Sequence, residues 1–193
     1  MSSSAVKPNS LVKLRVIAVK TLSQVLNSSL SLDEALFAEL TRNSAETKPE
    51  FDRSWIYEIC SGVLRYKGRL DYIMDTYALK KKPTGPLRRY LYTAIYQLLA
   101  QDTPSALVVS ETVQAIRENE GDMPSKFANA ILRKVADSRE QWQQWSVDSK
   151  SPAPEQAAWS SLPEWLFKKL VKQRGLEFTL AFAKASLDRP VTW

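Results

Sequence analysis

Histidine is absent from this 193-residue sequence, and cysteine occurs once, as Cys60. Without histidine the chain lacks the usual general base, the usual zinc ligand and every Ser-His or Cys-His nucleophile. A single cysteine excludes an intramolecular disulfide framework, and its place within an apolar helical run predicts an unreactive core thiol. We therefore expect no catalytic residue and no metal site in this chain.

Glycine is scarce, with 5 residues, and strict alternation of apolar and polar residues is missing, so sheets and their tight turns have little to form from. The scattered glycines also exclude a phosphate-binding loop of the G-x-G-x-x-G kind. Apolar residues recur instead at helical spacing, and Ser31 followed by Glu34 predicts a capping box. The predicted fold class is all-α, with about seven helices followed by a short two-helix segment. These helices are expected at about residues 10–27, 31–42, 51–65, 69–79, 87–100, 104–117 and 124–135, then 163–174 and 177–187.

Long hydrophobic runs are also lacking. No stretch approaches the ~20 apolar residues that cross a bilayer, and the polar leader 1–10 has no apolar block of a secretory signal. We expect a cytoplasmic protein without a membrane partner.

Positive charge is unevenly distributed along the chain. Residues 1–100 hold 15 Lys and Arg against 9 Asp and Glu, whereas residues 101–193 hold 12 of each. Eight basic residues and only two acids, Asp71 and Asp75, lie between residues 64 and 89. Such a segment is typical of a surface that binds the phosphates of a nucleic acid. The candidate RNA contacts in it are Arg65, Lys67, Arg69, Lys80, Lys81, Lys82, Arg88 and Arg89.

Six of the seven tyrosines lie between residues 66 and 96, in the same part of the chain. Exposed tyrosines could stack on unpaired bases, at about 1 to 3 kcal/mol each. The alternative is that most of them lie at the edge of the core and that the lysine run is a solvated helix end.

One charge lies on the wrong side of the first predicted helix. Arg15 falls in the middle of its apolar arc, and Glu111 falls on the inward side of the helix predicted at 104–117. A buried guanidinium needs an anion, so we expect Arg15 and Glu111 to form a structural ion pair.

The composition changes after residue 136. Residues 138–161 are rich in Gln, Ser, Ala and Pro and predict a linker, with Trp142 and Trp145 as docking anchors. A second unit, 162–193, offers two helices that cannot bury both their apolar faces alone. The chain is therefore expected to comprise a domain at 1–137, a linker at 138–161, and the truncated start of a further helical region at 162–193.

Four ordered segments of the chain carry a family resemblance: Arg53–Arg65, Leu87–Ala100, Ser105–Arg117 and Lys126–Lys134. They resemble the NusB-like RNA-binding domain in order and spacing. The tail Leu162–Trp193 is similar to the segment that follows NusB in bacterial 16S rRNA cytosine-5 methyltransferases of the Sun/Fmu (RsmB) family. The resemblance covers nearly the whole chain.

The resemblance implies a parent protein with a further, S-adenosylmethionine-binding domain and catalytic cysteines in Pro-Cys contexts, neither of which this sequence contains. The expected function is then an RNA-binding module that recruits 16S rRNA, with no cofactor bound by this chain. A second reading is a stand-alone NusB factor that binds RNA and a ribosomal protein in transcription antitermination. A third is a helical protein-interaction domain that never contacts RNA. The tail favours the first reading over the second.

The NusB resemblance also implies that the first helix helps to hold RNA. Lys7, Lys13 and Lys20 are its basic residues outside the apolar arc. The sequence departs here from the arginine-rich version of the family, because the single arginine of this helix, Arg15, is directed toward the core.

Overall fold

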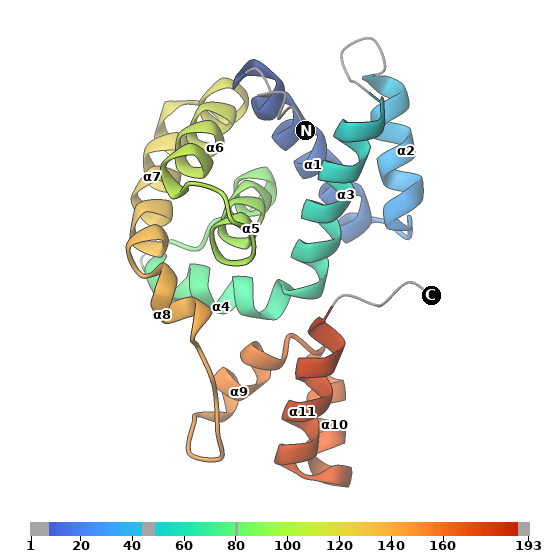
Figure 1. Ribbon diagram of the computed structural model, residues 1–193, viewed down its shortest axis with the longest axis vertical. Coiled ribbons are helices and arrows are strands. Elements are labelled where there is room, and N and C mark those ends of the chain that lie inside the picture. Colours follow the sequence, from blue (N-terminus) through green and yellow to red (C-terminus); the bar gives the residue numbers. More distant parts are fainter. Residues whose placement is uncertain (1–7, 44–48, 80, 189–193) are drawn as a thin grey trace, which may run out of the picture.

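The computed structural model in Figure 1 describes residues 8–43, 49–79 and 81–188, with side chains for 11–43, 53–79 and 81–188. These residues form eleven α-helices and no strand, which confirms the predicted all-α class. The helices are α1 (Pro8–Asn27), α2 (Leu32–Arg42), α3 (Pro49–Arg65), α4 (Lys67–Tyr77), α5 (Gly85–Ala100), α6 (Ser105–Glu120), α7 (Asp122–Asp137), α8 (Arg139–Gln143), α9 (Ala153–Ser160), α10 (Glu164–Arg174) and α11 (Leu176–Leu187).

Helix α5 is the centre of an upper body formed by α1 to α8. Every residue from Tyr90 to Leu98 is buried, because α1, α3, α4, α6 and α7 pack around this helix. In Figure 1 α5 is seen nearly end-on, with the other helices arranged around it. A helix that is apolar on all sides needs such a complete shell, so the sequence of α5 determines its central place.

Local signals fix the ends of several helices. Ser31 accepts a hydrogen bond from the Glu34 amide while the Glu34 carboxylate accepts one from the Ser31 amide, so the predicted capping box is confirmed. Gly121 alone separates α6 from α7, with a φ of 95° that only glycine adopts without strain. This turn lays α6 and α7 side by side.

Residues 138–161, expected to be a linker, contain α8 and α9. Pro154, one of the prolines of this segment, lies in the first turn of α9, where proline is tolerated because no intrahelical N–H is lost. Helix α9 packs on α4 and also contacts α10 and α11. Helices α9 to α11 thus form a lower unit, which lies below α4 in Figure 1.

A small polar network around Arg15 interrupts the apolar packing of the body. The Arg15 Nη2 atom donates to Glu111 Oε2 at 3.1 Å, with 2% and 7% of the two side chains exposed. Arg15 also donates to Gln97 of α5, and its guanidinium lies 5.7 Å from the ring centroid of Trp55 in α3. Burial lowers the pKa of Arg15, and Glu111 counteracts this effect. One arginine of α1 therefore ties together α3, α5 and α6.

None of the described helices combines the length and apolar character that crossing a bilayer requires.

Candidate nucleic-acid interface

Three basic side chains of the predicted segment meet along the junction of α4 and α5. Lys67 Nζ lies 2.8 Å from Asp71 Oδ2, and Lys82 Nζ lies 2.6 Å from Asp75 Oδ2. Arg88, in the first turns of α5, bridges the two carboxylates, in direct contact with Asp71 and 3.8 Å from Asp75. We call Lys67, Arg88 and Lys82 the α4–α5 cationic row.

Hydrogen bonds fix the middle of this row. Arg88 Nε donates to the Tyr92 hydroxyl at 2.7 Å, and that hydroxyl donates in turn to Asp71. Burial alone would raise the pKa of Asp71, but the hydrogen bonds from Lys67, Tyr92 and Arg88 outweigh it, so the pKa is lowered. Burial and the Asp71 carboxylate raise the pKa of Tyr92. At neutral pH Tyr92 is therefore a neutral phenol beside the Asp71 carboxylate and the Arg88 guanidinium.

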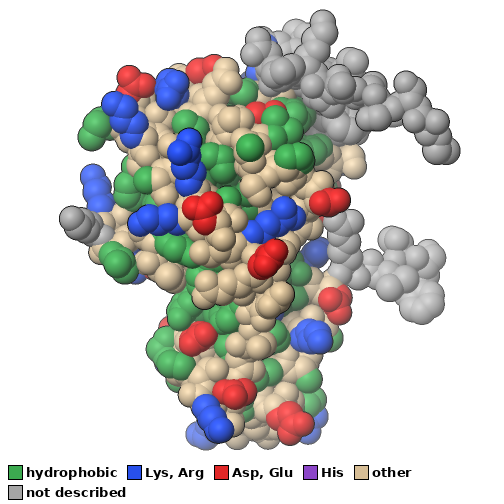
Figure 2. All heavy atoms as spheres, turned by 60° about the vertical axis from the view of Figure 1, so that its left-hand side comes forward, with side chains coloured by type: hydrophobic (Ala, Val, Ile, Leu, Met, Phe, Trp, Pro, Cys, Tyr) green, Lys and Arg blue, Asp and Glu red, His purple; other side chains and the backbone are tan. Residues whose placement is uncertain are grey.

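The row retains accessible positive charge. The side chains of Lys67 and Lys82 are 44% and 67% exposed, and Lys81 next to Lys82 is exposed as well. The face in Figure 2 shows Lys and Arg side chains spread over the upper body with Asp and Glu between them, so the positive charge there is interspersed with acids. The two acids of the segment lie among its cations, an arrangement that their number alone did not reveal.

Other predicted contacts lie apart from the row. Arg69 turns toward α9, where its Nε donates to the Trp159 carbonyl at 2.5 Å. Arg89 donates to Asn27 Oδ1 at the end of α1, at 3.0 Å. Arg65 ends α3 and is half-buried. Lys80 lies outside the described residues. The structure thus brings together only part of the predicted set.

The first helix presents a separate basic surface. Lys13 and Lys20 are exposed on α1, whereas Arg15 is buried on its opposite side. Lys7 lies outside the described residues. Arg15 therefore cannot contact RNA without unfolding the helix packing described above.

The tyrosines of the basic segment do not project freely into solvent. Tyr90, Tyr92 and Tyr96 are buried, and Tyr66, Tyr72 and Tyr77 are half-buried. Tyr72 instead stacks on Trp145, with ring centroids 5.0 Å apart and planes 16° apart. Of the two readings left open by the sequence, the core-edge reading describes these six residues.

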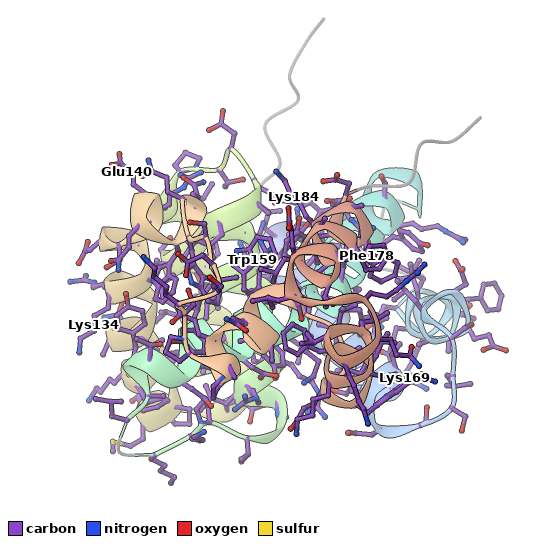
Figure 3. All side chains as sticks on the ribbon, turned by 90° about the horizontal axis from the view of Figure 1, so that it is seen from below. Lys134, Glu140, Trp159, Lys169, Phe178 and Lys184 are labelled. Carbon is purple, nitrogen blue, oxygen red and sulfur yellow. The ribbon has the colours of Figure 1, made fainter. Side chains whose placement is uncertain are left out.

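Two side chains that organise the structure, Gln97 and Trp159, were not identified from the sequence. Gln97 accepts a hydrogen bond from Arg15, and its position as a lone amide within the apolar run of α5 was the available signal. Trp159 packs its ring under the Arg69 guanidinium, 4.3 Å from centroid to Cζ. Figure 3, viewed from below, shows Trp159 near the centre, where α9 lies over the body. No local pattern marked Trp159.

The remaining chemistry of the described part is limited. Burial raises the pKa of the Cys60 thiol, which keeps it protonated and unreactive. No group of three or more potential metal ligands gathers among the described side chains. Among the described residues no strand is followed by a glycine-rich turn, and Gly62 and Gly68 lie within helices, so this part of the chain does not provide a Rossmann-type cradle for S-adenosylmethionine.

The helices of the upper body correspond to a known protein family. The profile of the NusB family matches residues 12–137, more than half of the chain, and the chain belongs to this family. Membership of the NusB family implies RNA binding.

Two relatives extend the comparison beyond the body. They are Ribosomal RNA small subunit methyltransferase B from Yersinia pseudotuberculosis serotype O:1b (strain IP 31758) and from Yersinia pestis bv. Antiqua (strain Angola). Each is 27% identical over 183 residues, which cover 93% of this chain and 39% of the relative. The chain is a NusB-family domain homologous to the N-terminal region of such proteins, and it spans about two fifths of their length.

The crystal structure of PH0851 superposes with a TM-score of 0.61, covering 98% of this chain and 40% of that one. At 13% identity this likeness shows the fold alone.

Proposed function

We propose that this chain is the RNA-recruiting part of an S-adenosylmethionine-dependent methyltransferase that acts on 16S rRNA, and that it contributes no catalytic residue. The observation that carries the proposal is the extent of the similarity. A match to Ribosomal RNA small subunit methyltransferase B over 93% of the chain must continue well past residue 137, where the NusB-family region ends. The cofactor and the methyl transfer belong to a part of the parent protein outside this sequence.

Contacts between the body and the tail support the methyltransferase reading over a stand-alone antitermination factor. The Arg69 amide donates to Ser161 Oγ at 3.1 Å, and the Tyr66 hydroxyl donates to the Leu187 carbonyl at 3.3 Å. A free NusB factor would need only the body. Here the lower unit is packed against α4, so the two parts would present RNA and the following region in a defined geometry.

The α4–α5 cationic row is the proposed phosphate-binding site, with Lys81 beside it and Lys13 and Lys20 on α1 as a second contact. Because Asp71 and Asp75 hold the row in place, little side-chain entropy is lost when a phosphate approaches. Each cation that neutralises a phosphate releases a counterion, and this makes binding depend on salt. The carboxylates reduce the net charge, so we expect a moderate salt dependence.

Retention of a labelled 16S rRNA fragment on nitrocellulose, at about 50 and about 200 mM salt, tests the proposal. The double variant Lys81→Gln/Lys82→Gln removes two exposed charges. It should weaken binding at low salt and reduce the slope of log K against log salt by about one to one and a half. The matched control, Lys172→Gln/Lys184→Gln, removes two exposed lysines outside the NusB-family region and should leave the slope unchanged.

Failure of the wild-type chain to bind at low salt would overturn the RNA proposal and leave a protein-interaction domain as the explanation. Equal loss in both double variants would show that total charge, and not the row, determines binding.

A further inference from the structure

A pocket of about 420 Å³ lies between α4, α5 and residues 142–145, in the size range of ligand sites. Leu70, Ile73 and Leu99 provide its apolar floor. Hydrophobic side chains also reach the surface at the waist between the upper body and the lower unit (Figure 2). Four aromatic side chains form its walls: Tyr66, Tyr96, Trp142 and Trp145.

Bonds made outside the pocket hold the two indole walls. Trp142 Nε1 donates to the Tyr77 hydroxyl and Trp145 Nε1 donates to Glu155 Oε1, each at 2.9 Å. The two rings meet edge to face, with centroids 5.5 Å apart. Because the indole N–H groups already have partners, the walls offer apolar ring surface and no unsatisfied donor.

The phenol walls are held in the same way. The Tyr66 hydroxyl donates to the Leu187 carbonyl, and the Tyr96 hydroxyl donates to Glu58 Oε1 at 2.9 Å. Their ring centroids are 5.9 Å apart, with planes tilted by 41°. Aromatic walls anchored from outside keep the cavity open, since closing it would break these bonds.

Arg69 supplies the polar edge of the pocket. Its guanidinium lies between the rings of Tyr66 and Trp159, at 5.6 and 4.3 Å from their centroids, and its Nε is bound to the Trp159 carbonyl. Burial lowers the pKa of Arg69 to about 10, so the side chain is still charged at neutral pH. Within the described part of the chain no hydrogen bond engages its terminal nitrogens, which leaves a fixed donor pair at the rim.

Gln143 adds a second polar group. Its Nε2 donates to the Leu99 carbonyl at 3.0 Å, so the remaining oxygen of the amide can accept a hydrogen bond. A donor pair and an acceptor therefore lie at the edge of an aromatic slot.

We propose that this pocket receives an unpaired nucleobase of the bound RNA. A nucleobase has two apolar faces for the aromatic walls and an edge of acceptors and donors for Arg69 and Gln143. A phosphate does not fit as well, because a single cation faces it among apolar walls. The proposal rests on the proposed function and adds to it a base-dependent component, separate from the phosphate contacts of the cationic row.

Ala100 gives a means of blocking the pocket without removing any of its contacts. It is exposed at the end of α5 and lines the pocket, so Ala100→Phe places a ring at the entrance. Ala130 is an exposed alanine of α7, and Ala130→Phe is the matched control for adding a surface ring. Thermal unfolding of both variants verifies that neither change disturbs the fold.

The probes are a short labelled oligoadenylate and an abasic ribose-phosphate chain of the same length and charge, compared by fluorescence anisotropy. Wild type and Ala130→Phe should bind oligoadenylate about tenfold more tightly than the abasic chain. Ala100→Phe should bind both chains equally.

The outcomes separate this proposal from the proposed function. If wild type binds both chains equally in a salt-dependent manner, or if the two variants keep the same preference, the pocket proposal is wrong while RNA binding stands. If wild type binds neither chain nor the 16S rRNA fragment, the proposed function fails and the nucleobase site fails with it.

Discussion

The Arg69 guanidinium lies 4.3 Å from the ring centroid of Trp159 and donates its Nε proton to the carbonyl of the same residue, 90 positions along the chain. One basic side chain of the segment that suggested RNA binding therefore connects α4 with α9. The ring contact and the hydrogen bond act on the same two residues, so removal of the guanidinium removes both.

Arg69→Ala should loosen the lower unit while leaving the body folded. Loss of the cation–π contact and of the hydrogen bond is expected to cost about 1 to 3 kcal/mol. Limited proteolysis should then cleave residues 138–161 faster than in wild type. Arg65→Ala, at a half-buried arginine at the end of α3, is the control and should keep the wild-type cleavage rate. Equal rates in all three proteins would show that the lower unit does not depend on Arg69.

The buried pair of Arg15 and Glu111 predicts a difference between two substitutions at one position. Arg15→Ala leaves a cavity and an unpaired buried carboxylate and should cost about 3 to 5 kcal/mol of unfolding free energy. Arg15→Met fills the space and should recover much of this loss, because the favourable packing of its side chain offsets part of the cost. Urea unfolding measures both. Both variants leave Glu111 without its cation, so the part of the loss that Arg15→Met does not recover reports the buried charge. Full recovery of stability in Arg15→Met would contradict a contribution from that charge.

Gly62 lies where α3 passes the ring of Tyr96. A Cβ atom at this position would lie 2.0 to 2.4 Å from atoms of that ring, well inside contact distance. Alanine normally stabilises a helix relative to glycine by about 1 kcal/mol. Gly62→Ala should nevertheless destabilise the protein by about 1 to 3 kcal/mol, because the buried ring must shift. A neutral or stabilising effect in urea unfolding would show that Tyr96 can move freely.

Much of the upper body could be predicted from sequence because its signals are local. The strongly apolar character of α5 predicted a central helix, and Ser31 with Glu34 predicted the start of α2. Residues 138–161 could not be assigned in the same way. The sequence of α9 has only a weak helical pattern. The helix is held by contacts of Arg69 with Trp159 and with Ser161 at its end, and no local pattern reveals these contacts.

The candidate site shows the same division. The composition identified the basic segment, but it could not show which neighbour each basic side chain contacts. Arg69 and Arg88 both belong to that segment, yet one is directed to Trp159 and the other to Asp71. Arg15 and Glu111 were easier, because a charge among apolar neighbours requires a partner whatever the fold.

The lowered pKa of Asp71 predicts how stability changes with pH. A carboxyl group whose pKa is lower in the folded state contributes stability above its ordinary value of about 4 and loses it as the pH falls through the folded value. The urea concentration at the midpoint of unfolding should therefore be lower at pH 3 than at pH 7. Asp71→Asn should lower the midpoint at pH 7 and flatten this pH dependence. Asp102→Asn, at an exposed aspartate, is the control and should follow wild type. An unchanged pH dependence in Asp71→Asn would show that Asp71 does not link folding to protons.

Docking of α9 against α4 has a consequence for the position of RNA bound as in the proposed function. Because the lower unit is packed against α4, RNA bound along Lys67, Arg88 and Lys82 would lie at a fixed distance and angle from the α10–α11 hairpin. Under the proposed function, such an arrangement would favour an RNA position by its distance from the phosphates held by the row, in addition to the base-dependent contact proposed for the pocket.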